Sequence, residues 1–233
     1  MRILIPNAIT AAALMCGVVS ILLSLRGEVH EATWWVLYST LLDRMDGAVA
    51  RALKASTAVG AQLDSFADFA SFGLAPAFLF LGIASPDLSP GLLLPVAVYV
   101  IGCAVRLARF NMIGSTDLFQ GVPTTVAGGI YAVVVNVCYH HGVLPEGHLW
   151  PFALLLAGFG VAMNLPWLRY RKLGRASRGQ NVSMGVAVLL CAVLIVIRRL
   201  PEILLLLTGL TLVLGPILSA RAPRPPVARP HEP

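Results

Sequence analysis

The sequence predicts an all-α membrane protein that crosses the bilayer several times. Of its 233 residues, 58% are hydrophobic and 12% are charged, whereas soluble domains carry about 25% charged residues. Apolar runs recur along almost the whole chain, and a helix needs roughly 20 such residues to cross a hydrocarbon core of about 30 Å. We therefore expect one membrane domain over residues 1–220, a bundle of about eight transmembrane helices and at least six. The proline-rich tail at 221–233 is expected to be disordered.

Eight apolar segments are candidates for these helices. They lie near residues 4–25, 31–53, 57–83, 90–112, 122–141, 147–167, 181–197 and 201–219. The second is the weakest, because it carries two aspartates. Prolines and glycines separate the third segment from the fourth and the fifth from the sixth. A signal peptide is the alternative for the first segment, but seven apolar segments follow it, so we interpret it as a membrane helix.

The distribution of lysine and arginine predicts how the helices are oriented. With eight spans and a cytoplasmic N-terminus, fourteen of these residues fall on the cytoplasmic side and three (Arg26, Arg198 and Arg199) fall outside. Because positive residues favour the cytoplasmic side, we expect both termini in the cytoplasm and the protein in the cytoplasmic (inner) membrane. The same topology explains the net charge of +6, so we expect no nucleic acid as a partner.

Four aspartates lie within this apolar sequence, at Asp43, Asp46, Asp64 and Asp68. An ionised carboxylate near lipid is costly unless it is paired, hydrated or bound to metal. The predicted topology places all four just inside the cytoplasmic boundary, and residues three or four apart share a helix face. Two divalent cations would balance four carboxylates, and oxygen ligands favour Mg²⁺ or Mn²⁺.

The residues between the aspartates complete a pattern with fixed spacing. It reads Asp-x2-Asp-Gly-x2-Ala-Arg-x8-Gly-x3-Asp-x3-Asp from residue 43 to residue 68. Small residues leave room for a ligand, although Gly47 or Gly60 taken alone would indicate helix packing. All eight specified positions resemble the signature of the CDP-alcohol phosphotransferase family. This resemblance implies a homodimeric bundle of membrane helices with a binuclear metal site. It also implies attack by an alcohol on the lipid-side phosphate of a CDP-lipid, with CMP leaving.

The resemblance also assigns roles to these residues. All four aspartates would bind two divalent cations, and Asp68 would also act as the general base on the acceptor hydroxyl. CDP-diacylglycerol would contact Asp46 and a set of residues bordering its nucleotide and phosphates, namely Asn7, Thr10, Gly47, Ala50, Arg51 and Gly60. Arg51 would contact phosphate or hold a carboxylate. For Asn7 and Thr10, a helix cap or an interhelical hydrogen bond is an equal alternative.

Segments outside the signature indicate the acceptor alcohol. Residues 6–17, 64–76, 106–111 and 119–123 resemble bacterial phosphatidylserine synthases, which favours serine. Arg106 and Arg109 share a helix face and suit a carboxylate or phosphate, although Arg109 also fits snorkelling at the membrane interface. Ser71 and Asn111 are weaker candidates for the acceptor pocket.

Two other functions are alternatives to serine transfer. The first keeps the chemistry and changes the acceptor to glycerol 3-phosphate, inositol phosphate or choline. The second is an ion transporter that uses membrane carboxylates. A transporter predicts carboxylates spread through the membrane depth, whereas these four are expected at one depth.

Overall fold

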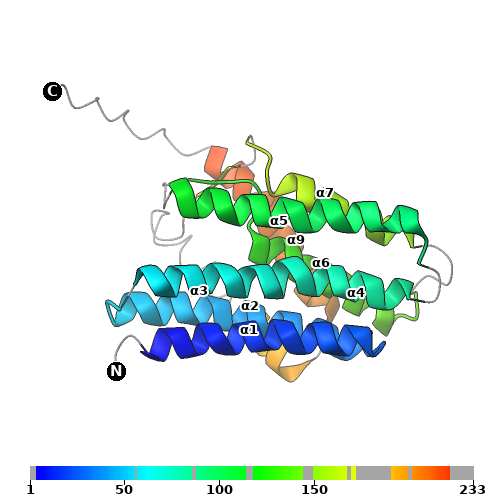
Figure 1. The fold of residues 1–233 in the computed structure, drawn as a ribbon, viewed down its shortest axis with the longest axis horizontal. Coiled ribbons are helices and arrows are strands. Elements are labelled where there is room, and N and C mark those ends of the chain that lie inside the picture. Colours follow the sequence, from blue (N-terminus) through cyan, green and yellow to red (C-terminus); the bar gives the residue numbers. More distant parts are fainter. Residues whose placement is uncertain are drawn as a thin grey trace.

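The computed structural model describes residues 4–55, 57–85, 88–113, 118–143, 149–166, 169–171, 190–198 and 201–220. These residues form a bundle in which α1 to α5 run along the long axis of the molecule (Figure 1). The helices of the bundle include α1 (Leu4–Leu25), α2 (Val29–Ala52), α3 (Ala58–Asp68), α4 (Ala75–Ala84), α5 (Leu93–Ile113), α6 (Thr124–His140), α7 (Trp150–Ala162) and α9 (Pro201–Ala220). Residues 190–197 are also helical. The helical class predicted from hydropathy is confirmed.

The helix bounds follow seven of the eight predicted segments, and the seventh segment is described only in part. The first segment, 4–25, coincides with α1. The sixth differs most at its end, because α7 stops at Ala162 and Pro166 lies shortly beyond, where the residue before a proline disfavours helical backbone. Only 190–197 of the seventh segment is described as helical, and the tail at 221–233 lies outside the described residues.

Three helical stretches of the described chain are long and apolar enough to cross a membrane, namely Leu4–Leu25, Ala58–Ala84 and Pro90–Met112. α2 has 24 residues but carries several charged side chains, and α6 and α7 have 17 and 13 residues. The predicted count of eight spans and the cytoplasmic location of both termini therefore stay predictions.

A two-stranded ribbon departs from the all-α prediction. β1 (Leu118–Gln120) pairs antiparallel with β2 (Arg169–Arg171), with Phe119 opposite Tyr170. The sequence signal was too short to predict strands of three residues, because their pairing depends on contact between distant segments. The ribbon joins the segment before α6 to the segment after α7.

Hydroxyl groups and small residues bring α1 into close contact with its neighbours. α1 packs against α2, α3 and α4. Ser20 Oγ donates to the Ala32 carbonyl at 2.9 Å, and Ser39 Oγ donates to the Ala13 carbonyl at 3.0 Å. Such interhelical hydrogen bonds are typical of membrane helices. They fix α1 against α2, the helix that carries the first two aspartates.

The third predicted segment is one helical stretch with an interruption in the middle. α3 ends at Asp68, the π-helical segment η1 (Phe69–Leu74) follows directly, and α4 continues to Ala84. A second short segment, the 3₁₀ turn η2 (Pro90–Leu92), leads into α5. The position of η1 immediately after Asp68 makes it part of the architecture of the site.

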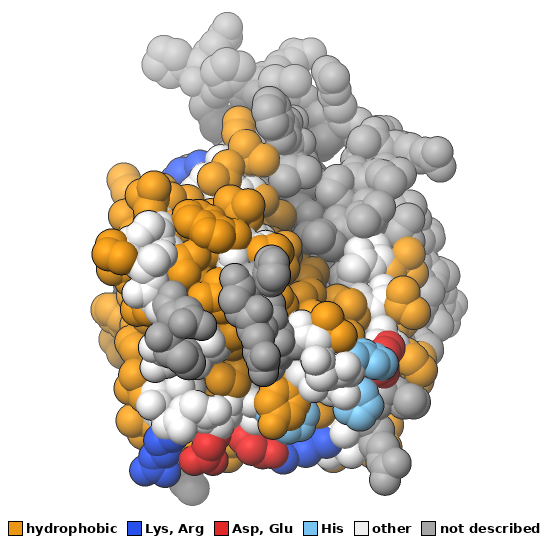
Figure 2. Space-filling view, turned by 90° about the vertical axis from the view of Figure 1, so that its right-hand side faces the viewer, with side chains coloured by type: hydrophobic (Ala, Val, Ile, Leu, Met, Phe, Trp, Pro, Cys, Tyr) orange, Lys and Arg blue, Asp and Glu red, His pale blue; other side chains and the backbone are white. Residues whose placement is uncertain are grey.

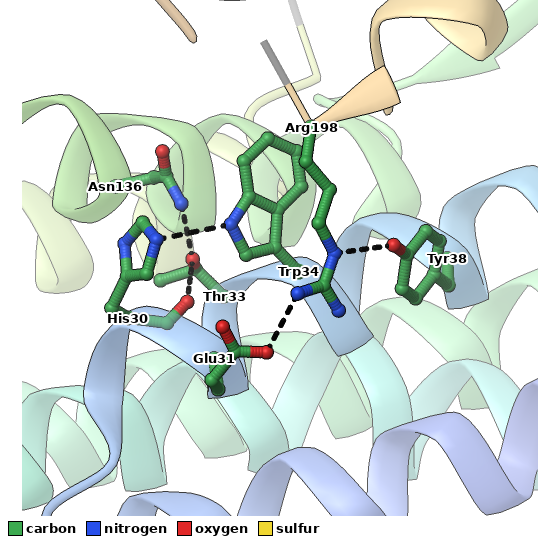
Figure 3. A network of polar contacts seen from close by, with 7 residues as sticks. All are labelled: His30, Glu31, Thr33, Trp34, Tyr38, Asn136 and Arg198. Carbon is green, nitrogen blue, oxygen red and sulfur yellow. Dashed lines mark hydrogen bonds and ion pairs between the residues drawn. The ribbon is translucent and has the colours of Figure 1, made fainter. Parts of the chain in front are cut away.

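The end of the bundle where α1 ends and α2 begins is viewed directly in Figure 2, with charged side chains and histidines along one border of a largely hydrophobic face. Figure 3 shows Arg198 reaching across α2. Its Nε donates to Tyr38 Oη at 2.7 Å and its Nη1 to Glu31 Oε2 at 2.8 Å. The guanidinium carbon lies 5.8 Å from the Trp34 ring centroid. Through these contacts Arg198, which directly follows the helical residues 190–197, packs against α2.

Candidate active site

Three of the four predicted aspartates come together between α2 and α3. Asp43, Asp64 and Asp68 each offer a carboxylate oxygen, and these oxygens lie within 4.8 Å of one another. All three are only partly exposed, so water screens their mutual repulsion incompletely. A set of converging hard oxygen donors fits Mg²⁺ or Mn²⁺ and contains no sulfur or imidazole ligand for a softer metal.

Asp46 lies one turn further along α2 and is held by α1. Its side chain is 5% exposed, and Thr10 Oγ1 donates to its Oδ2 at 2.7 Å. The same hydroxyl lies 3.1 Å from the Pro6 carbonyl. Thr10 therefore makes an interhelical hydrogen bond to a site aspartate, which is the alternative that the sequence left open, and its binding of CDP-diacylglycerol stays a prediction. The participation of Asp46 in metal binding stays a prediction.

Arg106 is a basic residue that the structure places near the carboxylates. It is close enough to Asp68 and Asp43 for direct electrostatic interaction, and its Nη1 donates to Thr124 Oγ1. Its Nε is buried and has no hydrogen-bond partner among the described residues. An unpartnered guanidinium nitrogen beside three carboxylates leaves one donor available for an anionic ligand.

Two site residues were missed in the sequence, Thr124 and Thr125 at the start of α6. Thr125 Oγ1 donates to Asp43 Oδ2 at 3.4 Å, a long hydrogen bond, and Thr124 is fully buried beside Arg106. The sequence feature that could have identified them is a pair of threonines directly after Pro123, where α6 begins. The closeness of Thr125 to Asp43 arises from tertiary packing of α6 on α2, which has no local sequence pattern.

The small residues of the signature lie next to the polar residues predicted to bind CDP-diacylglycerol. A Cβ added to Gly60 would lie 3.0 Å from Asn7 Oδ1, and one added to Gly47 would lie 3.3 Å from Arg51 Nη1. Gly60 is also where the cap of α3 forms, because its N–H donates to Thr57 Oγ1 at 3.0 Å. Gly47 and Ala50 are partly exposed and Arg51 is exposed, so this face of α2 is open beside the aspartates.

The other acceptor candidates lie in less favourable places. Ser71 is fully buried, and its Oγ donates to the Ala13 carbonyl at 3.1 Å. Asn111 is exposed and its Oδ1 accepts from Ser65 Oγ at 3.0 Å. Arg109 is partly exposed one turn beyond Arg106. Of the four predicted acceptor residues, Arg106 is therefore the one beside the carboxylate cluster.

Comparison with known proteins shows the family of the chain. The family model of the CDP-alcohol phosphatidyltransferases matches residues 3–157. A CDP-diacylglycerol–serine O-phosphatidyltransferase of Helicobacter pylori (strain ATCC 700392 / 26695) is 30% identical over 224 residues, covering 91% of this chain and 89% of the relative. The protein of that name from Bacillus subtilis (strain 168) is 34% identical over 144 residues, with 61% and 81% covered. One from Mycobacterium bovis (strain ATCC BAA-935 / AF2122/97) is 33% identical over 108 residues, with 46% and 37% covered. The chain belongs to the CDP-alcohol phosphatidyltransferase family.

Proposed function

We propose that the protein transfers the phosphatidyl group of CDP-diacylglycerol to the hydroxyl of serine, producing phosphatidylserine and CMP. In this reaction a bond forms between the serine oxygen and the lipid-side phosphorus, and the bond from that phosphorus to the CMP oxygen breaks. The observation that carries the proposal is the cluster of Asp43, Asp64 and Asp68 within 4.8 Å beside Arg106. The serine acceptor is supported by the H. pylori relative, which aligns with 91% of the chain.

The carboxylate cluster is the proposed site of two divalent cations, Mg²⁺ or Mn²⁺. Asp43, Asp64 and Asp68 would hold them, with Asp46 contributing from the same face of α2. When bound, these ions neutralise phosphate charge and stabilise the leaving CMP. The described part of the chain holds one such cluster, which supports group transfer over ion transport, because a transport path needs carboxylates at several depths.

The protein's own residues supply the remaining functions. Asp68 accepts the proton of the serine hydroxyl as the new bond forms. Arg106 uses its unpartnered Nε to bind the serine carboxylate. Arg51 contacts the phosphates of the nucleotide, and the open surface at Gly47, Ala50 and Gly60 admits the cytidine, with Asn7 and Thr10 at its border.

The predicted topology places this reaction at the cytoplasmic face of the inner membrane. The aspartates lie toward the end of the bundle where α2 ends and α3 begins. The lysine and arginine distribution favours the cytoplasm for that end. We also propose that the enzyme works as a homodimer, as the family resemblance implies. CMP, serine and the divalent cations are water-soluble, so this location gives them direct access.

The acceptor is tested with purified protein in detergent and CDP-diacylglycerol. Serine, glycerol 3-phosphate, inositol phosphate and choline are supplied separately, and CMP release and the lipid product are measured. We expect rapid CMP release with serine and a phosphatidylserine product. Release with glycerol 3-phosphate but not with serine would overturn the serine proposal and leave the family chemistry intact. The variant Asp68→Asn serves as the inactive control.

A further inference from the structure

The helix that carries Asp64 and Asp68 changes its hydrogen-bond pattern directly after Asp68. In η1 (Phe69–Leu74) the spacing is π-helical, and at its end the Ala75 N–H donates to the Ala70 carbonyl, five residues earlier. A π-helical turn contains one residue more than an α-helical turn, and such turns occur frequently at functional sites. The element is therefore a local insertion between α3 and α4.

This insertion determines the direction in which α3 presents its carboxylates. One residue corresponds to a rotation of about 100° around an α-helix. α4 is fixed by its packing, since Ala75, Leu79 and Phe80 are fully buried. If the π turn became an α turn, α3 would rotate by about 100° relative to α4. Asp64 and Asp68 would then turn away from Asp43.

A tyrosine from another helix donates a hydrogen bond to a carbonyl of this turn that has no α-helical donor. The α-helical donor to the Phe72 carbonyl would be residue 76, but Pro76 has no N–H. Tyr99 of α5 supplies the missing donor, because its hydroxyl donates to the Phe72 carbonyl. Tyr99 is fully buried, so water cannot replace this hydrogen bond.

The backbones of two further helices pack closely against the same turn. A Cβ added to Gly128 of α6 would lie 2.9 Å from Phe72 Cα, and one added to Gly17 of α1 would lie 2.5 Å from Ser71 Oγ. These contacts restrict how far η1 can move, but they do not supply a donor to the Phe72 carbonyl. Ser71 Oγ of η1 also donates to the Ala13 carbonyl of α1, but among the described residues it is the Tyr99 hydroxyl that donates to the Phe72 carbonyl.

We propose that Tyr99 is a positioning residue, whose hydroxyl holds the π turn and thereby directs Asp64 and Asp68 toward Asp43. The consequence for metal binding rests on the proposed function. Loss of the hydroxyl leaves the buried Phe72 carbonyl without its donor. This loss shifts the equilibrium between the π turn and an α turn by about 5- to 150-fold toward the α turn. Tyr99 would therefore affect the carboxylate cluster without being a metal ligand itself.

The test compares Tyr99→Phe with Tyr131→Phe. Tyr131 is also fully buried, but its hydroxyl has no hydrogen-bond partner in the described part of the chain. The rate of CMP release, the KM for CDP-diacylglycerol, thermal unfolding and Mn²⁺ binding by electron paramagnetic resonance are measured for both. We expect Tyr99→Phe to lower kcat and weaken Mn²⁺ binding by about tenfold or more, with KM little changed. Tyr131→Phe should resemble the wild type. Equal effects of the two substitutions would overturn the proposal.

Pro76→Ala provides the second arm, because it restores a backbone N–H four residues after Phe72. The ratio of kcat between the phenylalanine and tyrosine forms at position 99 is measured with the native proline and in the Pro76→Ala background. We expect the ratio to approach one in the Pro76→Ala background, and an unchanged ratio would refute the role of the Phe72 carbonyl. If Tyr99→Phe alone does not fold, the double variant Tyr99→Phe with Pro76→Ala is compared with Pro76→Ala: equal activity supports the proposal and lower activity opposes it. Absence of Mn²⁺ binding in the wild type would contradict the proposed metal site, whereas this ratio would still test Tyr99.

Discussion

Replacing Thr10 by valine removes the hydroxyl that fixes Asp46 and retains a β-branched side chain of similar size. Thr10 is 4% exposed and Asp46 is 5% exposed, so solvent neither screens nor replaces their 2.7 Å hydrogen bond. A hydrogen bond to a charged group contributes about 1.5–3 kcal/mol. We expect Thr10→Val to lower the free energy of unfolding by that amount, and to raise the KM for CDP-diacylglycerol because Asp46 loses its fixed orientation.

The measurement is an unfolding titration in mixed detergent micelles, together with steady-state CMP release. Thr40→Val on α2 is the matched control, because Thr40 Oγ1 donates only to the Val36 carbonyl of its own helix, at 3.1 Å. If the two valine variants have unfolding free energies within about 0.5 kcal/mol of each other and the same KM, the reasoning about the Thr10–Asp46 contact is wrong.

Three further predictions concern the carboxylates and the Arg198 contacts. Asp68→Asn should lower CMP release by about 10²- to 10⁴-fold, because a general base contributes that much, while calorimetry still detects CDP-diacylglycerol binding; substantial turnover would exclude Asp68 as the base. Asp64→Asn should weaken Mn²⁺ binding by more than about tenfold, measured by electron paramagnetic resonance, and unchanged affinity would remove it from the ligand set. Arg198→Gln should lower stability by about 1 kcal/mol in the same unfolding titration with kcat unchanged, and a selective loss of kcat would show that this end of the bundle takes part in catalysis.

The parts of the structure that were predictable are those with a local sequence signal. The length and polarity of α1 define a membrane helix without reference to any other segment. The spacing of Asp64 and Asp68 places them on one face of a helix, and the structure brings both to Asp43. Thr57 is a favourable cap for α3, and its hydroxyl accepts the Gly60 N–H.

The unpredicted parts depend on contacts between distant residues. Pro76 indicates a disturbed helix, but a kink and a π turn satisfy the same local pattern. The partner that distinguishes them, Tyr99, is 27 positions from Phe72 in sequence. Thr125 is 82 positions from Asp43, and its proximity follows only from the packing of α6 on α2. Hydropathy cannot predict either contact, because it is calculated for each segment separately.

The two helices of the site hold their carboxylates in different ways. On α2, hydroxyls from neighbouring helices orient the side chains, since Thr10 donates to Asp46 and Thr125 to Asp43. On α3, no hydroxyl of the described residues donates to Asp64 or Asp68, so their direction depends on the helix backbone and hence on the turn that follows Asp68. Substituting a threonine should therefore disturb one carboxylate of α2 at a time. A change at Tyr99 should displace both carboxylates of α3 together, because they rotate with one helix.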